Sequence, residues 1–201
     1  MKIGITGGIG SGKSYVCRQL LDKGYPVYSC DDEAKRLMQE SQEIRQQLTE
    51  LIGNQAYTEG KLNRTAIAQY LFQNKNNAER INHIVHPAVR KDMEEWYKHQ
   101  RPTLCFVESA ILFEAGFDSA VDVTVMVYAD DEVRLQRAMK RDNADSGTIQ
   151  RRMAQQLPQQ EVCRRADYTL HNNPTDDIDV EINKMIKNLK SLTLKPLNRK
   201  Q

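Results

Sequence analysis

The sequence predicts a wound α/β protein in which five parallel strands form the central sheet. Residues 2–6 form a short apolar run, a glycine-rich loop follows, and residues 12–23 have the spacing of a helix that Gly24 ends. Residues 27–30 then supply a second strand, and the crossover helix of such a unit implies parallel strands. Three more apolar, β-rich runs, each followed by a helix-compatible stretch, complete the sheet: 103–107, 121–128 and 168–171.

A long helical insertion separates the second and third strands. The stretch from Asp32 to about Gln100 has helical spacing and no convincing strand. Turn signals divide the insertion and the end of the chain into further elements. These are a helix that begins at 62–64 after a turn at Gly60, a long amphipathic helix after 74–77, a terminal helix over 174–192 and a frayed basic tail over 195–201.

Length and composition limit the classes of protein that are possible. A chain of 201 residues supports one core domain with appendages, and 39% hydrophobic and 28% charged residues are typical of a globular protein. No apolar run is long enough for a signal peptide or a membrane span, so we expect a cytoplasmic protein without a membrane partner. The cysteines form no C-x-x-C pair, which argues against a disulfide scaffold and a zinc site: Cys17, Cys30, Cys105 and Cys163.

Gly7 to Ser14 spells G-x-x-x-x-G-K-S directly after the first strand, which is the phosphate-loop motif of the three-layer α/β/α P-loop NTPases. Its glycines let successive N–H groups point at phosphate oxygens, and the helix that follows adds its dipole. We expect Lys13 to reach the β- and γ-phosphates and Ser14 to coordinate Mg²⁺. The alternative is a glycine-rich turn that only caps a helix. The residues expected to bind the nucleotide are Gly8, Ile9, Gly10, Ser11, Gly12, Lys13, Ser14 and Tyr15.

Two carboxylates follow predicted strands at the edge where wound α/β sheets build their sites. We expect Asp31 to face the γ-phosphate, orient an alcohol acceptor and take its proton. The alternative is that Asp31 or Asp32 caps a helix that begins around Glu33. Glu108, at the end of the third strand, is a candidate for organising the surroundings of the magnesium ion. Burial with a hydrogen-bonded partner is equally compatible with its position.

Basic residues gather between Arg134 and Arg165, although the formal net charge of the chain is only +2. Such a segment attracts nucleic acid or closes over the phosphates of a small nucleotide, and a solvated helix face is the alternative. Arg134, Arg137 and Arg141 recur at spacings of three and four, so one face of a helix that begins near Asp130 carries them. Because the chain also has a phosphate loop, we expect that face to meet phosphates.

His83 and His86 are three residues apart in a predicted helix, a spacing that is compatible with a metal pair. No third ligand is in register with them. A structural or substrate-contacting role is therefore favoured over a metal site.

Together these residues resemble the dephospho-coenzyme A kinase family, and the resemblance runs from Lys2 to about Asn172. Beyond the phosphate loop, the order and separation of the pieces carry it. The matching pieces are residues 5–14, Asp31 with Ala34, residues 60–64, His86–Pro87, residues 111–114, residues 137–142, Arg152 with Gln155, and residues 166–167 leading to Asn172. The departures from the family pattern remove no group with a proposed chemical role: Tyr15, Cys30, Ser109–Ala110 and Asn173–Pro174.

The resemblance implies a kinase that uses ATP and Mg²⁺ to phosphorylate the ribose 3′-hydroxyl of dephospho-coenzyme A, giving coenzyme A and ADP. It makes Asp31 the catalytic base, closes Arg137 on the ATP phosphates and brings Asn172 near the adenine. Arg64 and His86 would bind the substrate.

The resemblance also implies a division of the chain into domains. These are a nucleotide-binding core over residues 1–31, 101–136 and 161–201, a helical substrate domain over 32–100 and a lid over 137–160. The implied partner is the small-molecule substrate, with no nucleic acid and no membrane, and we expect a monomer or a weak homo-oligomer.

Two other classes of function fit part of the pattern. Another small-molecule or nucleoside monophosphate kinase would share the architecture, because the fold alone does not fix the acceptor. A nucleotide-dependent switch or nucleic-acid-binding ATPase would use the basic stretch as its footprint. Against this second class, the arginines lack the interleaved aromatic residues that a single-strand platform requires.

Overall fold

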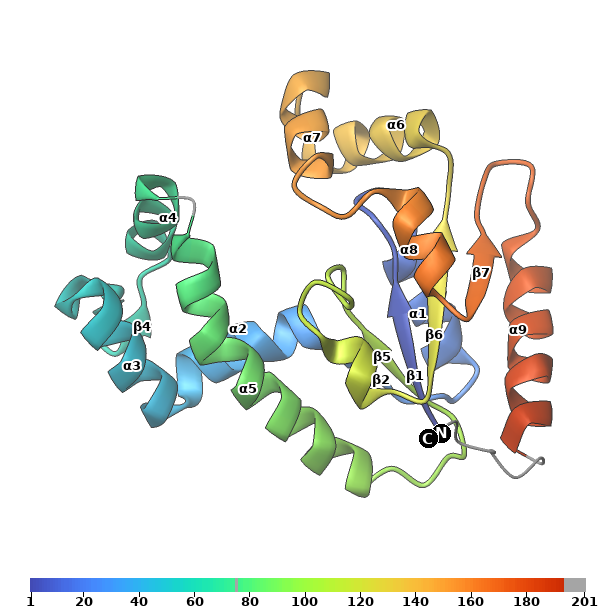
Figure 1. The fold of residues 1–201 in the computed structure, drawn as a ribbon, viewed down its shortest axis with the longest axis horizontal. Helices are drawn as coiled ribbons and strands as arrows, with labels where there is room; N and C mark the ends of the chain where they lie inside the picture. Colours follow the sequence, from blue (N-terminus) through green and yellow to red (C-terminus); the bar gives the residue numbers. More distant parts are fainter. Residues whose placement is uncertain (75, 194–201) are drawn as a thin grey trace. The chain divides into compact units, whose positions relative to one another are not determined.

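A computed structural model describes residues 1–74 and 76–193 of the chain. The chain separates into two compact units, and Figure 1 labels their elements. Unit 1 consists of Met1–Tyr28 together with the chain from Gln100 onward, and unit 2 is Ser29–His99.

Unit 1 is built on a five-stranded sheet with the strand order β2-β5-β1-β6-β7 (Figure 1). The central strand β1 pairs in parallel with β5 and β6, and β6 pairs in parallel with β7. The three inner strands β5, β1 and β6 are almost entirely buried, as expected where helices cover both faces of a sheet. The strands are β1 (Lys2–Thr6), β2 (Val27–Ser29), β5 (Cys105–Glu108), β6 (Val123–Tyr128) and β7 (Tyr168–His171).

Helices cover the two faces and complete three layers. On one face, Val16 of α1 and Met185 of α9 join the core that the sheet residues build. On the other face, Met126 of β6 packs with Phe113 and with Val162, which belongs to α8. The neighbours of Met126 in β6 point to the first face, because side chains alternate along a strand. The helices of unit 1 are α1 (Lys13–Asp22), η2 (Phe117–Ala120), α6 (Asp131–Asp142), α7 (Ser146–Met153), α8 (Gln159–Arg165) and α9 (Ile178–Thr193).

Unit 2 is helical and has its own core. Its longest helix, α5, buries a stripe of apolar side chains at a spacing of four residues, from Ile81 to Met93. No helix among the described residues has the length and apolar character needed to cross a membrane. The elements of unit 2 are α2 (Cys30–Glu40), α3 (Gln42–Ile52), η1 (Asn54–Ala56), β3 (Tyr57–Thr58), β4 (Lys61–Leu62), α4 (Arg64–Gln73) and α5 (Asn77–Lys98).

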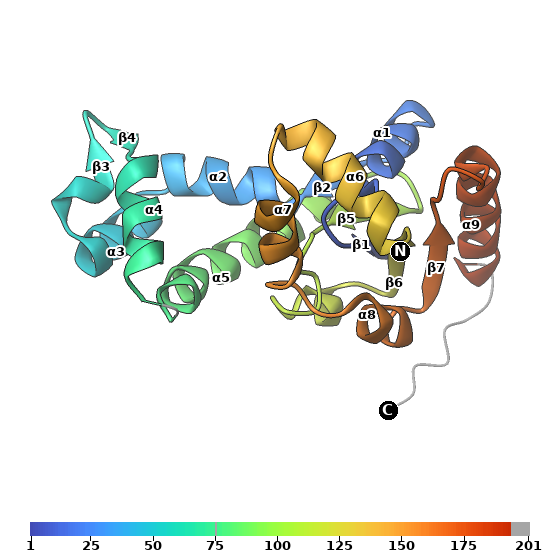
Figure 2. The same cartoon turned by 90° about the horizontal axis from the view of Figure 1, so that it is seen from above.

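The prediction that the insertion contains no strand is wrong, because β3 and β4 form a short antiparallel hairpin (Figure 2). The turn residues Glu59 and Gly60 both have positive φ, 50° and 78°. Positive φ at both central positions gives the turn a twist that matches that of the flanking strands. Two-residue strands are too short to show an alternation of apolar and polar residues, so the pattern is invisible in the sequence.

The remaining boundaries agree with the sequence to within a few residues. The bounds of β1 and β7 are as predicted, and α4 begins at Arg64 behind the cap Asn63. The third and fourth predicted strands begin later, at Cys105 and Val123, and α9 begins at Ile178. The predicted basic tail over 195–201 lies outside the described residues.

The alternative in which Asp31 or Asp32 caps the helix after the second strand is wrong, and so is a start of this helix around Glu33. This helix, α2, begins at Cys30, and its N-cap is Ser29, whose hydroxyl accepts a hydrogen bond from the Asp32 amide at 3.4 Å. Asp31 and Asp32 instead occupy the first turn, where negative charge interacts favourably with the helix dipole. Asp31 therefore has no capping role.

Replacement of the cap in Ser29→Ala should lower the free energy of unfolding by about 1 kcal/mol, because the Asp32 amide loses its acceptor. Urea unfolding monitored by circular dichroism measures this change. Thr65→Ala is the matched control, because Thr65 is an exposed hydroxyl residue in the first turn of α4 that is not its cap. Equal stability of the two variants would contradict the assignment of Ser29 as the cap.

Candidate active site

The phosphate loop of unit 1 is packed so tightly that its glycines have no room for a side chain, as Gly10 and Gly12 illustrate. Gly10 has φ 78°, and a Cβ there would lie 2.1 Å from the carbonyl oxygen of Arg134 in α6. Gly12 has φ 96°, and a Cβ there would lie 2.1 Å from the amide nitrogen of Asn172. The loop therefore follows the surface that α6 and the end of β7 present to it.

The helix that follows the loop has no internal cap. Its N-cap residue Gly12 makes no side-chain hydrogen bond, and its first turn contains no acidic residue. The amides of Lys13 and Ser14 have no acceptor within the helix, since the first-turn N–H groups of any helix lack one. An uncapped N-terminus that follows a glycine loop is a binding site for an anion such as a polyphosphate.

Lys13 is held by a carboxylate from the neighbouring strand. Its Nζ lies 3.6 Å from Oε1 of Glu108, and the two side chains are only 11% and 13% exposed. The register that pairs Ile5 with Glu108 brings the end of β5 beside the end of β1. Glu108 thus has the partner that its position allows, and this partner is the lysine of the phosphate loop.

A cysteine lies one helical turn behind this lysine, in the core beneath the loop. Burial, and then the charge of Glu108, raise the pKa of Cys17 to about 12. A thiol with so high a pKa is not a nucleophile at neutral pH.

The three arginines of α6 have different partners within the protein. Arg134 is buried, donates from Nε to the Ile9 carbonyl at 3.0 Å and pairs with Asp131 at 2.9 Å. Arg137 donates to the Asn172 carbonyl at 2.8 Å. Arg141 pairs with Asp142 at 2.7 Å and is exposed. Burial therefore assigns Arg134 to the support of the loop, and the expectation that this helix face meets phosphates stays a prediction.

Asn172 is also built into the support of the loop. It is buried, its side-chain amide donates to the Ser11 carbonyl at 2.8 Å, and its backbone amide donates to the Tyr128 carbonyl. The predicted contact of Asn172 with an adenine stays a prediction.

Gln156 contacts the loop and was missed in the sequence. Its Oε1 accepts from the Ile9 amide at 2.9 Å, and its Nε2 donates to the Ala110 carbonyl at 3.3 Å. The sequence pattern pointed instead to Gln155, which is exposed. Both glutamines lie between α7 and α8, where no helical period distinguishes one from the other, so no signal in this sequence could have selected Gln156.

The predicted site residues of unit 2 lie on three helices. Asp31 is exposed in the first turn of α2, and among the described residues its side chain makes no hydrogen bond or ion pair. Arg64 is the first residue of α4 and is exposed. His86 lies within α5 and is half-buried, and burial, followed by His83 and Arg90, lowers its pKa.

Arg36 links α2 to α5 within unit 2. Arg36 bonds to Glu33 and Glu40 of its own helix and to Asp92 of α5, the last at 2.7 Å. These carboxylates, Glu33 first, raise the pKa of Arg36 above its usual range. Through Glu33, these ion pairs connect the first turn of α2, which carries Asp31, with Asp92 of α5.

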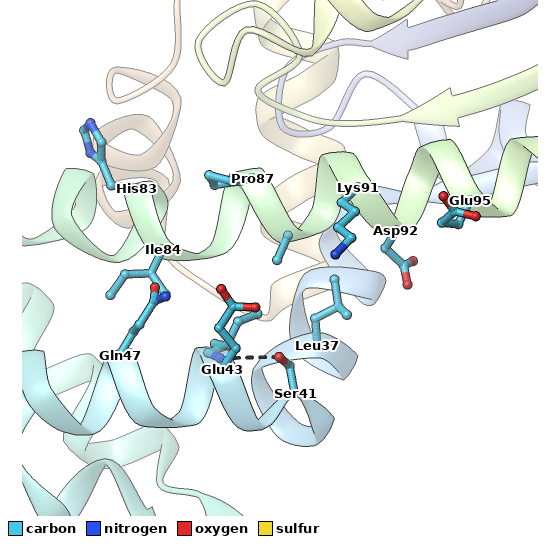
Figure 3. Close-up of a pocket in the computed structure, with 12 residues that line it drawn as sticks. Leu37, Ser41, Glu43, Gln47, His83, Ile84, Pro87, Lys91, Asp92 and Glu95 are labelled. Atoms are coloured by element: carbon cyan, nitrogen blue, oxygen red, sulfur yellow. Dashed lines mark hydrogen bonds between the residues drawn. The ribbon is translucent and has the colours of Figure 1, made fainter.

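Unit 2 also contains a groove of about 490 Å³ between α5 and the α2–α3 segment (Figure 3). Leu37, Ile84 and Pro87 contribute apolar surface to it, and Glu43 and Lys91 contribute charge. The lining contains none of the predicted substrate-binding residues Asp31, Arg64 and His86. No group of three or more His, Cys, Asp or Glu side chains in the described parts of the chain could hold a metal.

Comparison with known sequences gives consistent matches along the chain. A family model described as dephospho-CoA kinase matches residues 1–177. The dephospho-CoA kinase of Bacteroides fragilis (strain YCH46) is 43% identical over 174 residues, which cover 86% of this chain and 85% of that protein. The dephospho-CoA kinase of Porphyromonas gingivalis is 40% identical over 198 residues and 98% of both chains.

Solved structures share the fold. TT1252 from Thermus thermophilus matches with a TM-score of 0.82 and 31% identity over 96% of this chain and 97% of its own. Dephospho-CoA kinase from Campylobacter jejuni matches with a TM-score of 0.69 at 23% identity, over 96% of this chain and all of its own, which is a likeness of fold alone. Because the family model and both curated relatives span most of the sequence, this chain belongs to the dephospho-CoA kinase family.

Proposed function

We propose that this chain transfers the γ-phosphoryl group of ATP to the ribose 3′-hydroxyl of dephospho-CoA and releases CoA and ADP. The observation that carries this function is the identity to named dephospho-CoA kinases along nearly the whole chain. The uncapped N-terminus of α1 behind the phosphate loop supports the use of a nucleoside triphosphate.

The phosphate loop and Arg137 hold ATP. Lys13 exchanges its partner Glu108 for the β- and γ-phosphates and stabilises the charge that develops between them. Arg137 neutralises further phosphate charge, and Asn172 lies near the adenine. The loop contacts come from residues 8–15.

Asp31 acts as the catalytic base. It accepts the proton of the 3′-hydroxyl while the oxygen attacks the γ-phosphorus, and the bond from that phosphorus to the bridging oxygen breaks with its electron pair leaving on ADP. The exposure of Asp31 and its freedom from the capping role support this assignment. Arg64 and His86 bind the substrate.

The donor set near the loop fits Mg²⁺. Ser14 has an exposed hydroxyl and Glu108 a carboxylate, and hard oxygen donors supplemented by phosphates and water are what this ion prefers. Ser14 would be its ligand, with Glu108 organising its surroundings. When bound, the ion supplies neutralisation of phosphate charge.

The remaining assignments follow from the family. Residues 32–100 form the substrate domain, residues 137–160 form the lid, and the other residues form the nucleotide-binding core. The chain works on a small molecule in the cytoplasm, without nucleic acid, as a monomer or weak homo-oligomer.

An acceptor panel tests the reaction directly. With ATP and Mg²⁺, ADP release should depend on dephospho-CoA, and its kcat/KM should exceed those of adenosine, AMP and shikimate by roughly 10²-fold or more, because bound contacts to the whole acceptor contribute to the transition state. Mass spectrometry of the product should locate the new phosphate on the ribose. A better rate with any other acceptor would overturn the substrate assignment.

Lys13→Ala should lower kcat by about 10²- to 10³-fold, because charge stabilisation at the β–γ bridge is lost. Steady-state kinetics with saturating ATP measure the effect. Lys23→Ala, at an exposed lysine just after α1, is the control and should be close to wild type. A normal kcat in Lys13→Ala would count against the site.

Asp31→Asn should lower kcat by about 10²-fold or more and leave the Kd of ATP unchanged, because the amide keeps the shape and cannot accept the proton. Asp32→Asn is the matched control, since Asp32 is the neighbouring carboxylate and is bound to Lys35 at 2.8 Å. Loss of turnover in the control with normal turnover in Asp31→Asn would transfer the role to Asp32.

A further inference from the structure

The backbone of Ile9, at the tip of the phosphate loop, is hydrogen-bonded through both its N–H and its carbonyl group. Its N–H donates to Gln156 Oε1 at 2.9 Å, and its carbonyl accepts from Arg134 Nε at 3.0 Å. The two side chains come from parts of the chain that are remote in sequence from the loop. Gln156 is separated from Ile9 by 147 residues and Arg134 by 125. These two hydrogen bonds are therefore tertiary contacts and are not part of the loop motif.

Each of the two side chains that bond Ile9 makes a second hydrogen bond. Arg134 is 4% exposed, and its Nη1 donates to Asp131. Gln156 uses its Nε2 to reach the Ala110 carbonyl, which lies just beyond the end of β5. A side chain with two hydrogen bonds has few rotamers left, so both side chains hold Ile9 in one position.

These two hydrogen bonds act on a residue that lies between two glycines, in addition to the close packing at Gly10. Gly8 and Gly10 flank Ile9, and glycine loses more conformational freedom on ordering than any other residue. The bonds come from the chain itself, so the loop is ordered before a ligand contributes anything. Binding is tighter when the ordering cost is met in advance in this way.

We propose that Gln156 is a positioning residue for the nucleotide: it fixes the Gly8–Ile9 peptide through the Ile9 N–H and thereby pre-forms the phosphate loop. Gln156 acts through Ile9 and does not touch the reacting atoms. The inference rests on the proposed ATP site in that the ligand is a nucleoside triphosphate. It also ties the loop to the segment between α7 and α8, so that the loop is ordered from outside its own motif.

A different role for Gln156 predicts a change of the opposite sign in nucleotide affinity. A side chain that occupies the Ile9 amide would withhold this donor from a phosphate, and its removal would then tighten nucleotide binding. The second hydrogen bond of Gln156, to the Ala110 carbonyl, holds its side chain in place. This favours the positioning role over a role in which a phosphate displaces the side chain from the Ile9 amide.

The test is Gln156→Met, which keeps the length of the side chain and removes both hydrogen bonds. Calorimetry should give a Kd for ATP that is raised about three- to ten-fold, the effect of losing the one hydrogen bond that Gln156 makes to the loop. The KM for dephospho-CoA and the kcat at saturating ATP should stay close to wild type. Hydrogen exchange at Ile9 should become faster.

Gln155→Met is the matched control, because Gln155 is the exposed neighbour and its side chain makes no hydrogen bond among the described residues. It should leave the Kd of ATP and the exchange at Ile9 unchanged. Gln156→Asn, whose shorter amide cannot bridge both partners, is a second variant should the first not fold, and it should weaken ATP binding in the same direction.

Three results would overturn the inference: an unchanged Kd of ATP, a tighter one, or an equal rise in the constants for ATP and dephospho-CoA. Direct binding of ATP to the full chain is measured without any acceptor. A wild-type protein that bound ATP and failed to phosphorylate dephospho-CoA would therefore contradict the proposed function and leave this inference to its own test.

Discussion

The close fit of the phosphate loop against α6 and Asn172 is the constraint on which unit 1 depends. At Gly10 and Gly12 the neighbouring atoms occupy the space of any side chain, so the loop can take this path only with glycine. Arg134 and Asn172 also donate hydrogen bonds to the carbonyls of Ile9 and Ser11, and these bonds fix the position of the loop against its supports. Since the carbonyls face these supports, the start of α1 is left to present its amides, and the helix begins without a cap.

Features written in consecutive residues could be predicted from the sequence. β1 and β7 have the predicted bounds because each is a short apolar run, and α4 begins where Asn63 offers a cap. The phosphate loop and its lysine follow from the spacing of the motif. The ends of elements are predicted less accurately where one residue can belong to either of two adjacent elements. Cys30 is an example, because it is the first residue of α2 and not the last residue of β2.

Features that depend on contacts between distant residues could not be predicted. The hydrogen bond from the Ile9 amide to Gln156 joins residues that lie far apart in the sequence, and nothing local separates Gln156 from Gln155. Arg134 shared its helical spacing with Arg137, and only burial sets it apart. The cap of α2 could not be identified for a different reason: Ser29 and the two aspartates that follow are all good caps, and the length of β2 decides among them.

The position of Cys17 has a consequence for the resistance of the protein to chemical damage. Oxidants and alkylating agents react with thiolates, and a thiol whose pKa is about 12 is almost entirely protonated at neutral pH. The sulfur lies in the apolar core one turn behind Lys13, where an added oxygen would push against the sheet. Peroxide stress should therefore spare the helix that carries the lysine, and inactivation by such reagents would have to begin elsewhere in the chain.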